Sequence, residues 1–474
     1  MKKLTVLMLV CALVLGLCAC AGGGNKETEP KLEGLNVGYS KQDITPDFEV
    51  GLGGYDNAKT RRFTGTVRSK IYLTCIAMTE GDETVLLFSQ DILRCDAGPV
   101  SKARKAINEA TGVPEDHIMF CATHTHSAPS LTVGDTGSNK MLELYVNAAV
   151  TAATEALADR ASATAYGVEQ DVKGMNFVRN YLEPDGTILQ SHETVNTPAA
   201  ANALQYLTEV DDEMVVIKFD RAGDKKDIMV MNWQAHPCYN DEGGKGTSIS
   251  ADFIGVARDT VEQNTDMHFI YFTGAAGNQG TDTRIVKDKH YLTMEEYGAK
   301  LAQAAIDMLP SAELIQGEGI KTKQEQFTYA YDHSQDHLVD KAQEVYDLYQ
   351  NGQMDKAQDL YPKYGFASVY ESRAILSRSK YGQTGTMEFN TIYVAGMAFV
   401  HVPYEQFSDA SIQIKGESPF KYTVMATCSN NGYSYIASER AYDLKSYEGC
   451  TGFFARGCSE AAADKFVEML KALQ

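Results

Sequence analysis

The sequence predicts an α/β fold with a mixed central sheet, flanking helices and a small helical insertion. Three observations lead to this prediction. Short apolar, β-rich runs alternate with segments in which apolar residues recur at helical spacing. Polar residues follow several apolar runs directly, and one tyrosine-rich segment departs from the alternation. The chain has 474 residues and 44% hydrophobic content, so it is long enough to bury a large core.

Strands are predicted where short apolar runs end at polar or glycine-containing segments. These runs are 84–88, 118–122, 215–219, 228–233, 268–272, 391–395 and 422–426. The runs 215–219 and 228–233 are expected to pair. Helices are predicted where apolar residues recur three and four positions apart, at 100–111, 141–159, 254–262 and 293–308.

The helical insertion is predicted at about 329–381, with helical spacing at 338–349, 354–361 and 367–377. Its tyrosines have two interpretations: they pack the insertion internally, or the insertion forms a lid over a cleft. They are Tyr329, Tyr331, Tyr346, Tyr349, Tyr361, Tyr364 and Tyr370.

The N-terminus predicts export. Residues 1–19 have the charged start, apolar middle and small-residue end of a signal peptide. The segment Leu17-Cys18-Ala19-Cys20 resembles a bacterial lipobox, so 1–19 is predicted to be a lipoprotein signal peptide. Cys20 is then lipidated and anchors the protein to the membrane at the bacterial cell surface. Residues 20–35 are predicted to be a flexible tether, followed by one catalytic domain at 36–474. The alternative is an ordinary secretory signal with release into the medium.

The formal charge of −20 argues against nucleic acid as a partner, since binding phosphates needs basic surface. Acidity of this kind favours solubility at a cell surface. Seven of the ten cysteines follow Cys20. Cys450 and Cys458 are the easiest pair to join by a disulfide, and no cysteine is assigned a catalytic role.

A pair of histidines suggests a metal site. His124 and His126 lie in "FCATHTHSAP", just after the apolar run 118–122. Alternate residues of an extended strand point to the same face, so both imidazoles can meet one ion. The alternative is two solvated side chains in a loop, and the pair needs partners from elsewhere.

Further polar residues follow other predicted strands. Open α/β sheets gather their sites at the carboxyl ends of strands, so one cleft is expected to collect these side chains. They are Asp91, His124, His126, His236, Asn278 and Glu405.

Ordered motifs along the chain resemble the neutral/alkaline ceramidase family, specifically its catalytic N-terminal domain. They are "DITP" (43–46), "GLGGY" (51–55), "THTHSAP" (123–129), "NFVRN" (176–180), "NWQAHP" (232–237), "SADF" (250–253), "GAAGN" (274–278), "VPYEQF" (402–407) and "YIASERAYDLKSYEG" (435–449). One position departs from the pattern, because Gly280 stands where the family has a serine. The substituted residue is expected to affect substrate binding more than metal binding.

The resemblance implies a Zn²⁺ ion held by His124, His236, Glu405 and Tyr435. It places His126 on the substrate side and implies that Arg179 and Tyr447 stabilise the developing oxyanion. A phenol has a pKa of about 10 and is an unusual zinc ligand. Reasoning from the residues alone leaves a second arrangement open, in which both His124 and His126 bind the ion and Tyr435 only donates a hydrogen bond.

The resemblance therefore implies a zinc-dependent hydrolase that cleaves an amide bond in an N-acyl, ceramide-like lipid or small molecule by metal-activated water. Two other classes stay open. A metal-dependent esterase or phosphoesterase could use the same histidines with Asp91, and a non-catalytic surface lipoprotein could bind a ligand without turnover.

Overall fold

The computed structural model describes residues 34–55, 58–182, 186, 188–190, 205–206, 208–281 and 292–474. The signal peptide at 1–19, Cys20 and the tether up to residue 33 lie outside the described residues. All described residues belong to one unit of the chain. The division into signal, tether and catalytic domain stays a prediction.

The larger sheet is mixed, as predicted. Among the described residues it has nine strands in the order β12-β11-β10-β5-β1-β2-β3-β4, with β14 paired to β5. The pairs β3 with β4 and β11 with β12 are parallel, and the other pairs are antiparallel. The strands are β1 (Leu35–Asp43), β2 (Tyr72–Glu80), β3 (Glu83–Gln90), β4 (Ile118–Ala122), β5 (Ala161–Asp171), β10 (Glu213–Arg221), β11 (Asp227–Trp233), β12 (Met267–Thr273) and β14 (Glu313–Leu314).

A second, four-stranded sheet packs on the first. Within the described part of the chain its order is β15-β16-β17-β19, and β17 with β19 is its parallel pair. Apolar side chains of both sheets, such as Val215 and Phe399, share one buried cluster. The sequence predicted one central sheet and did not reveal this second layer. Its strands are β15 (Ile320–Ala330), β16 (Thr384–Val394), β17 (Met397–His401) and β19 (Tyr422–Ala426).

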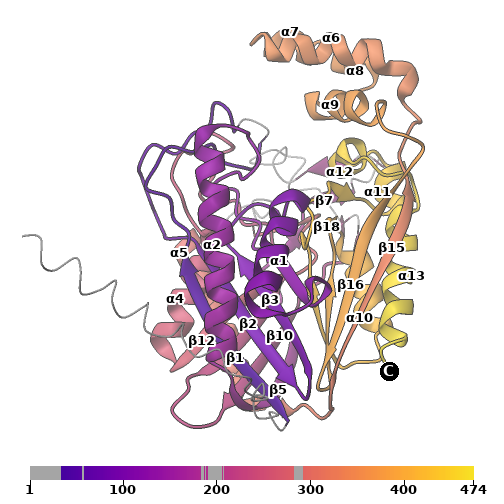
Figure 1. Cartoon of the computed structure of the whole chain (residues 1–474). Helices are drawn as coiled ribbons and strands as arrows, with labels where there is room; N and C mark the ends of the chain where they lie inside the picture. The colour runs from indigo at the N-terminus through magenta and orange to yellow at the C-terminus, as the bar shows by residue number, and fades with distance from the viewer. Residues whose placement is uncertain are drawn as a thin grey trace, which may run out of the picture. The chain divides into compact units, whose positions relative to one another are not determined.

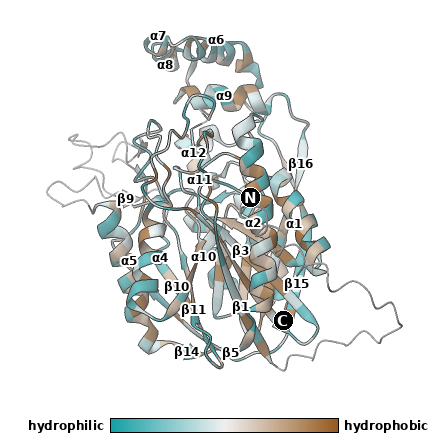
Figure 2. Cartoon of the chain, turned by 60° about the vertical axis from the view of Figure 1, so that its left-hand side comes forward, coloured by the Kyte–Doolittle hydropathy of each residue, from teal (hydrophilic) through white to brown (hydrophobic). Residues whose placement is uncertain are grey.

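Helices cover the outer faces of both sheets, so the layers run helix, sheet, sheet, helix (Figure 1). α1 (Ala97–Thr111) and α2 (Thr136–Ala158) pack on β2 to β4, and α4 (Asp252–Asn264) and α5 (Met294–Met308) pack on β10 to β12. α10 (Ser408–Glu417) and α13 (Cys458–Lys471) cover the second sheet. Figure 2 shows hydrophobic and hydrophilic residues on the same helices, as expected where one side packs on a sheet.

Strand residues alternate between the two faces of the larger sheet. In β3, Leu86 and Phe88 face the cluster with α1 and α2, whereas Val85 and Leu87 face the second sheet. Both faces are covered, so these strands are continuously apolar in sequence.

Four helices lie between β15 and β16: α6 (Val339–Gln350), α7 (Met354–Gln358), α8 (Tyr361–Tyr364) and α9 (Val369–Arg378). They have a hydrophobic cluster of their own that includes Val345, Phe366 and Ile375. In Figure 1 they lie beyond one end of the β15–β16 hairpin.

The remaining elements are short. They are η1 (Glu115–His117), β6 (Phe177–Val178), β7 (Asn180–Leu182), β8 (Ile188–Gln190), β9 (Gln205–Tyr206), β13 (Gln279–Gly280), η2 (Leu309–Ser311), η3 (Asp336–Leu338), β18 (Glu405–Gln406), β20 (Tyr435–Ile436), α11 (Glu439–Asp443) and α12 (Tyr447–Thr451).

The predicted disulfide between Cys450 and Cys458 is wrong. Both thiols are free, and burial raises the pKa of each to about 12. Cys450 lies in α12, whereas Cys458 begins α13 and packs in the cluster beneath the second sheet. A short sequence separation therefore does not bring the two thiols together.

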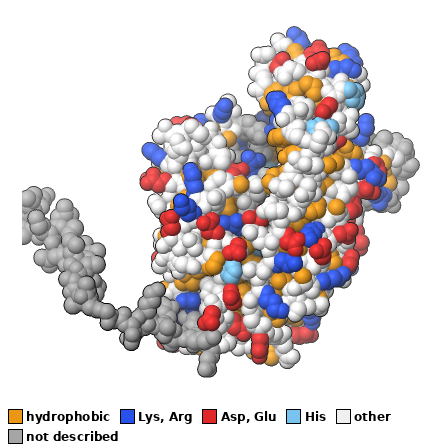
Figure 3. Space-filling view, turned by 45° about the vertical axis from the view of Figure 1, so that its right-hand side comes forward, with side chains coloured by type: hydrophobic (Ala, Val, Ile, Leu, Met, Phe, Trp, Pro, Cys, Tyr) orange, Lys and Arg blue, Asp and Glu red, His pale blue; other side chains and the backbone are white. Residues whose placement is uncertain are grey.

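No helix among the residues that the structure describes is long and apolar enough to cross a membrane. Figure 3 shows acidic and basic side chains interspersed on one face, so the surplus of acidic groups creates no field of a single sign there.

Gly38 marks the closest approach between β1 and α2. A Cβ atom at Gly38 would lie 1.9 Å from the carbonyl oxygen of Ala156. We expect Gly38→Ala to lower the free energy of unfolding by about 2 kcal/mol or more, because helix and strand must move apart. Gly98→Ala, at an exposed site in α1 with nothing near the new methyl group, is the matched control and should cause no loss. Denaturant unfolding measures both, and equal stability of the two variants would contradict this packing.

Candidate metal centre

The cleft lies where three parallel strand pairs end. His124 follows β4, His236 follows β11, and Glu405 follows β17, each within a few residues of the strand end. All three side chains line one cleft of about 1340 Å³. The expectation that polar residues at strand ends meet in one place is therefore confirmed for these three residues.

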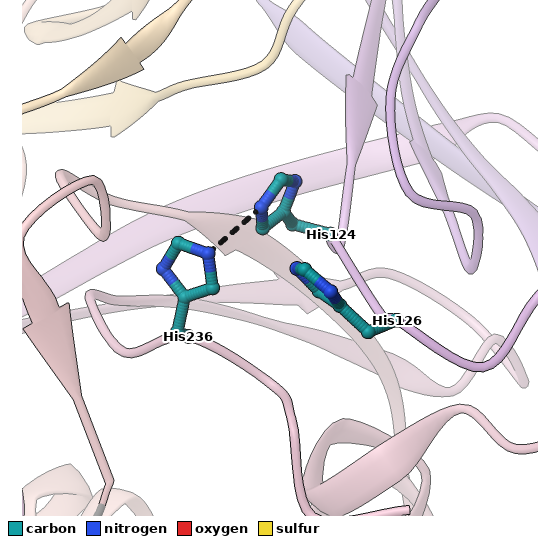
Figure 4. Close-up of side chains that lie close together, drawn as sticks. All are labelled: His124, His126 and His236. Carbon is teal, nitrogen blue, oxygen red and sulfur yellow. Dashed lines mark hydrogen bonds between the residues drawn. The ribbon is translucent and has the colours of Figure 1, made fainter. Parts of the chain in front are cut away.

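The two imidazoles are held by backbone carbonyls. His124 Nδ1 lies 2.6 Å from the oxygen of Leu93, and His236 Nδ1 lies 2.7 Å from the oxygen of Ala276. A carbonyl oxygen only accepts, so each Nδ1 carries a hydrogen, and each Nε2 presents a lone pair when its ring is neutral. The two Nε2 atoms lie 3.1 Å apart, at hydrogen-bond distance (Figure 4). A proton or a cation must lie between them, because two bare lone pairs at this distance would repel.

Glu405 supplies the matching negative charge. Its Oε2 lies 3.3 Å from His124 Nε2 and 3.5 Å from His236 Nε2, and it accepts no hydrogen bond. Ligand atoms around a tetrahedral ion with bonds of about 2.0–2.1 Å are about 3.3–3.4 Å apart. The three measured separations match one face of such a tetrahedron. Two imidazoles and a carboxylate are also a donor set that suits zinc, so the residues fit the ion.

The electrostatics of the cluster agree with cation binding. Burial lowers the pKa of His236 well below its usual range, and the nearby Arg179 and His124 lower it further. His236 is therefore neutral at pH 7, as a metal ligand must be. At His124 burial also lowers the pKa, but Cys428 and Glu405 outweigh it and hold the pKa well above the usual range. His124 therefore holds a second proton, on Nε2, when no metal ion is bound, and a cation can take the place of that proton.

His124 adopts a left-handed backbone conformation, with φ of 68°. Such a conformation is uncommon outside glycine, and strain of this kind is concentrated at functional sites. The Nδ1 atom of His124 also lies 3.6 Å from the sulfur of Cys428. Cys428 follows β19 as His124 follows β4, so the same strand-end pattern could have identified Cys428 as a residue of the cleft.

His126 stands beside the pair, and its ring is directed toward the other two in Figure 4. One ring nitrogen of His126 lies within 4.8 Å of ligand nitrogens of His124 and His236. Its side chain is 8% exposed, and neither ring nitrogen has a hydrogen-bond partner. Burial, followed by the charges of His124 and Arg179, lowers its pKa well below the usual range. Both predicted roles of His126, as a ligand and as a group on the substrate side, are compatible with this position.

Tyr435 lies next to Glu405, because β18 and β20 pair in parallel with these two residues in register. Burial and the charge of Glu405 raise the pKa of Tyr435 well above its usual range, although Arg179 lowers it. The phenol is therefore protonated. The guanidinium carbon of Arg179 lies 5.5 Å from the centroid of the Tyr435 ring. Whether Tyr435 binds a metal stays a prediction.

Arg179 is fixed in the wall of the cleft. Its Nε donates to Glu448 Oε1 at 2.8 Å, and its Nη2 donates to the carbonyl oxygen of Gly277 at 2.7 Å. Glu448 is fully buried and also accepts from Asn180. Tyr447 begins α12, and its ring centroid lies 6.2 Å from that of Tyr435. Arg179 and Tyr447 both line the cleft, and their catalytic roles stay predictions.

Asp91 and Asn278 do not line the cleft, so the expectation fails for them. Asp91 accepts from Arg258 Nη2 at 2.8 Å and from the backbone of Tyr72 at 2.9 Å. The Asn278 side chain donates to Thr208 and accepts from the backbone of Ser408. Both residues follow strands as the metal-site candidates do, but their side chains turn inward to hold neighbouring elements.

Sequence reasoning missed several groups of the cleft. Cys238 and Asp241 lie just after His236, and Tyr55 lies in "GLGGY". Tyr346 and Tyr370 of the predicted insertion also line the cleft, which agrees with its interpretation as a lid. Gly280, where the resembling family has a serine, is bridged to the backbone of His236 and therefore lies close to the candidate centre.

Comparisons with known proteins identify a family and a shared fold. Residues 35–283 match the family described as neutral/alkaline non-lysosomal ceramidase, N-terminal. A crystal structure of neutral ceramidase from Pseudomonas aeruginosa is similar with a TM-score of 0.67 and 14% identity, covering 93% of this chain and 74% of that one. A structure titled ceramidase complexed with C2 is similar with the same TM-score and identity, covering 93% and 75%. No curated protein matches the sequence of this chain. At this identity the structures show a shared fold.

The inward role of Asp91 gives a prediction. The side chains of Asp91 and Arg258 are 0% and 4% exposed. Asp91→Ala leaves the guanidinium charge buried without its carboxylate, so we expect a loss of about 3–5 kcal/mol in the free energy of unfolding. Asp266→Ala, which removes an exposed ion pair with Lys226, is the control and should cause no measurable change. Metal content that falls in Asp91→Ala while the fold stays intact would contradict the assignment.

Proposed function

Because the chain belongs to the neutral/alkaline non-lysosomal ceramidase family, we propose that it is a zinc-dependent amidohydrolase acting on N-acyl, ceramide-like substrates. One observation carries the proposal: two imidazole Nε2 atoms and a carboxylate oxygen that accepts no hydrogen bond converge within 3.1–3.5 Å in a cleft large enough for a lipid amide.

His124, His236 and Glu405 would hold the ion, with Tyr435 as the fourth candidate beside Glu405. When bound, zinc acts as a Lewis acid that lowers the pKa of water and polarises a carbonyl group. The carbonyl partners of the two Nδ1 atoms fix the tautomers in advance. Such outer partners orient ligands and raise their basicity.

The other groups of the cleft act on the substrate. Arg179 is oriented by Glu448 and the Gly277 carbonyl, so its positive charge is preorganised for an oxyanion. Tyr447 keeps its proton, because burial raises its pKa, and it can donate a hydrogen bond to the same oxygen. His126 is neutral, so one of its ring nitrogens can take a proton from water and return it to the leaving nitrogen.

An esterase or phosphoesterase is the second candidate class. A role for Asp91 in such an enzyme is unsupported, because its carboxylate accepts a hydrogen bond from Arg258 outside the cleft. The histidines and Arg179 would still suit an ester, which shares the carbonyl chemistry of an amide. A non-catalytic binding lipoprotein has to explain why buried imidazoles converge on a carboxylate oxygen that accepts no hydrogen bond.

We expect zinc to bind near one ion per chain in purified protein, and the zinc content to drop in His236→Ala and Glu405→Ala. Release of fatty acid from N-acyl amides, including ceramide, should fall at least ~100-fold in both variants, because each loses a direct ligand. His337→Ala, which removes an exposed histidine of η3, is the matched control and should retain zinc and activity. Elemental analysis and fatty-acid release measure the two properties.

A folded, metal-free parent that stays inert after zinc is supplied would contradict the proposal and favour the binding lipoprotein. The same panel should include esters and phosphate esters of matched chain length. Faster cleavage of the amide than of the phosphate ester is expected, because Arg179 and Tyr447 are arranged for a single carbonyl oxygen.

We also propose that the enzyme is exported and held at the membrane by a lipid on Cys20, which supports action on lipid amides. Cys20→Ser should remove lipid incorporation and shift the protein from the membrane fraction to the soluble fraction. Cys18→Ser, two positions earlier, is the control and should leave lipidation intact. Cell fractionation with a labelled fatty acid tests this, and an unlabelled parent released into the medium would contradict it.

A further inference from the structure

A second group of potential ligands lies beside the first centre. Among the described residues, His126, Cys238 and Asp241 bring one ligand atom each to within 4.8 Å of one another. All three line the same cleft as His124 and His236. We propose that this group is a second, inhibitory site for a thiophilic divalent cation such as Zn²⁺.

His126 is the first argument for the second site. Its side chain is 92% buried, since 8% is exposed, and both ring nitrogens are without a hydrogen-bond partner. Buried polar groups almost always find partners in folded proteins. An imidazole has two ring nitrogens, and His126 belongs both to the group with Cys238 and Asp241 and to the group with His124 and His236. Gly54 leaves room at Nδ1, because a Cβ there would lie 3.0 Å from this nitrogen.

Asp241 is fixed before any ligand arrives. Tyr55 donates its hydroxyl hydrogen to Asp241 Oδ2, and the backbone of Gly243 donates to Oδ1 at 2.8 Å. Each carboxylate oxygen can accept more than one bond, so both keep a lone pair. Cys238 Sγ and an oxygen of this carboxylate lie within 4.8 Å of each other, close enough for both to bind one cation.

The donor types decide which cations fit. One imidazole nitrogen, one thiolate and one carboxylate suit zinc or cadmium, whereas magnesium and calcium prefer oxygen alone. The thiolate and the carboxylate together supply two negative charges to a divalent cation. Binding requires loss of the thiol proton to solvent, because the thiolate is the ligand. The second site should therefore be weaker than the first at neutral pH.

Inhibition follows from the shared residue and rests on the proposed function. A cation on His126 removes the nitrogen lone pair that accepts a proton during hydrolysis. The enzyme should then be active with one zinc ion per chain and lose activity when a second is bound. Tyr346, Tyr370 and the rest of the cleft need not move.

The experiment uses cobalt, because a cobalt–thiolate bond gives a charge-transfer band in the near ultraviolet that imidazole and carboxylate ligands do not give. Metal-free protein is titrated with Co²⁺. We expect the first equivalent to bind without this band and the second to produce it. Cys238→Ser should abolish the band, and Asp241→Asn should weaken the second equivalent at least ~10-fold. Cys428→Ser, which alters the other thiol lining the cleft, is the matched control and should keep the band.

Activity gives an independent readout. The rate of each protein at excess Zn²⁺ is divided by its own rate at one equivalent. This ratio should be about 0.1 or lower in the parent, because excess Zn²⁺ inhibits it at least tenfold. It should stay near one in Cys238→Ser. Excess Mg²⁺ should not change it in either protein. Circular dichroism establishes that the variants are folded.

The outcomes separate the two proposals. One bound cobalt ion without the band, or a band that disappears in Cys428→Ser and persists in Cys238→Ser, would overturn the second site and leave the proposed function standing. A band that depends on Cys238 in a protein without hydrolytic activity would support the second site and count against the proposed function.

Discussion

The buried Oε2 oxygen of Glu405 is the group on which the centre depends. A carboxylate oxygen removed from water must be balanced by a cation or by hydrogen-bond donors, and Oε2 of Glu405 accepts no hydrogen bond. Two imidazole Nε2 atoms lie 3.3 and 3.5 Å from it, and the Nδ1 hydrogens of these rings are given to Leu93 and Ala276. Two ring nitrogens and a negative charge therefore meet at one point. The arrangement is favourable when positive charge occupies that point.

The fold creates this point by stacking two sheets. His124 and His236 follow parallel pairs of the larger sheet, whereas Glu405 follows the parallel pair of the smaller one. Parallel neighbours end on the same side, so each pair delivers its loop to one edge. The shared apolar cluster between the sheets sets the distance between those edges. The backbone of Gly277 donates to Gln406, which ties the loop after β12 directly to Glu405.

Sequence reasoning found what is encoded locally. Strands buried on both faces appear as continuous apolar runs, and the main helices have clear spacing, so both were predicted. β15 alternates lysine and glutamine with partly buried residues, and this hid the second sheet. The strand-end pattern selected Asp91 as readily as His124, because the direction of each side chain is set by partners that are distant in sequence. Arg258 turns Asp91 inward, and no nearby residue in the sequence reveals this. The position of Tyr435 beside Glu405 likewise came from the family resemblance.

Unpartnered groups in a folded protein cost stability, and they persist where they have a use. Glu405 Oε2 and both nitrogens of His126 share this property within one cleft. Replacing His126 by an apolar residue of similar size would remove the cost, so packing alone does not explain its presence. Its neutral ring keeps a lone pair at neutral pH, and it lies within 4.8 Å of two sets of potential metal ligands. A side chain that can serve either set links the chemistry of one centre to the occupancy of the other.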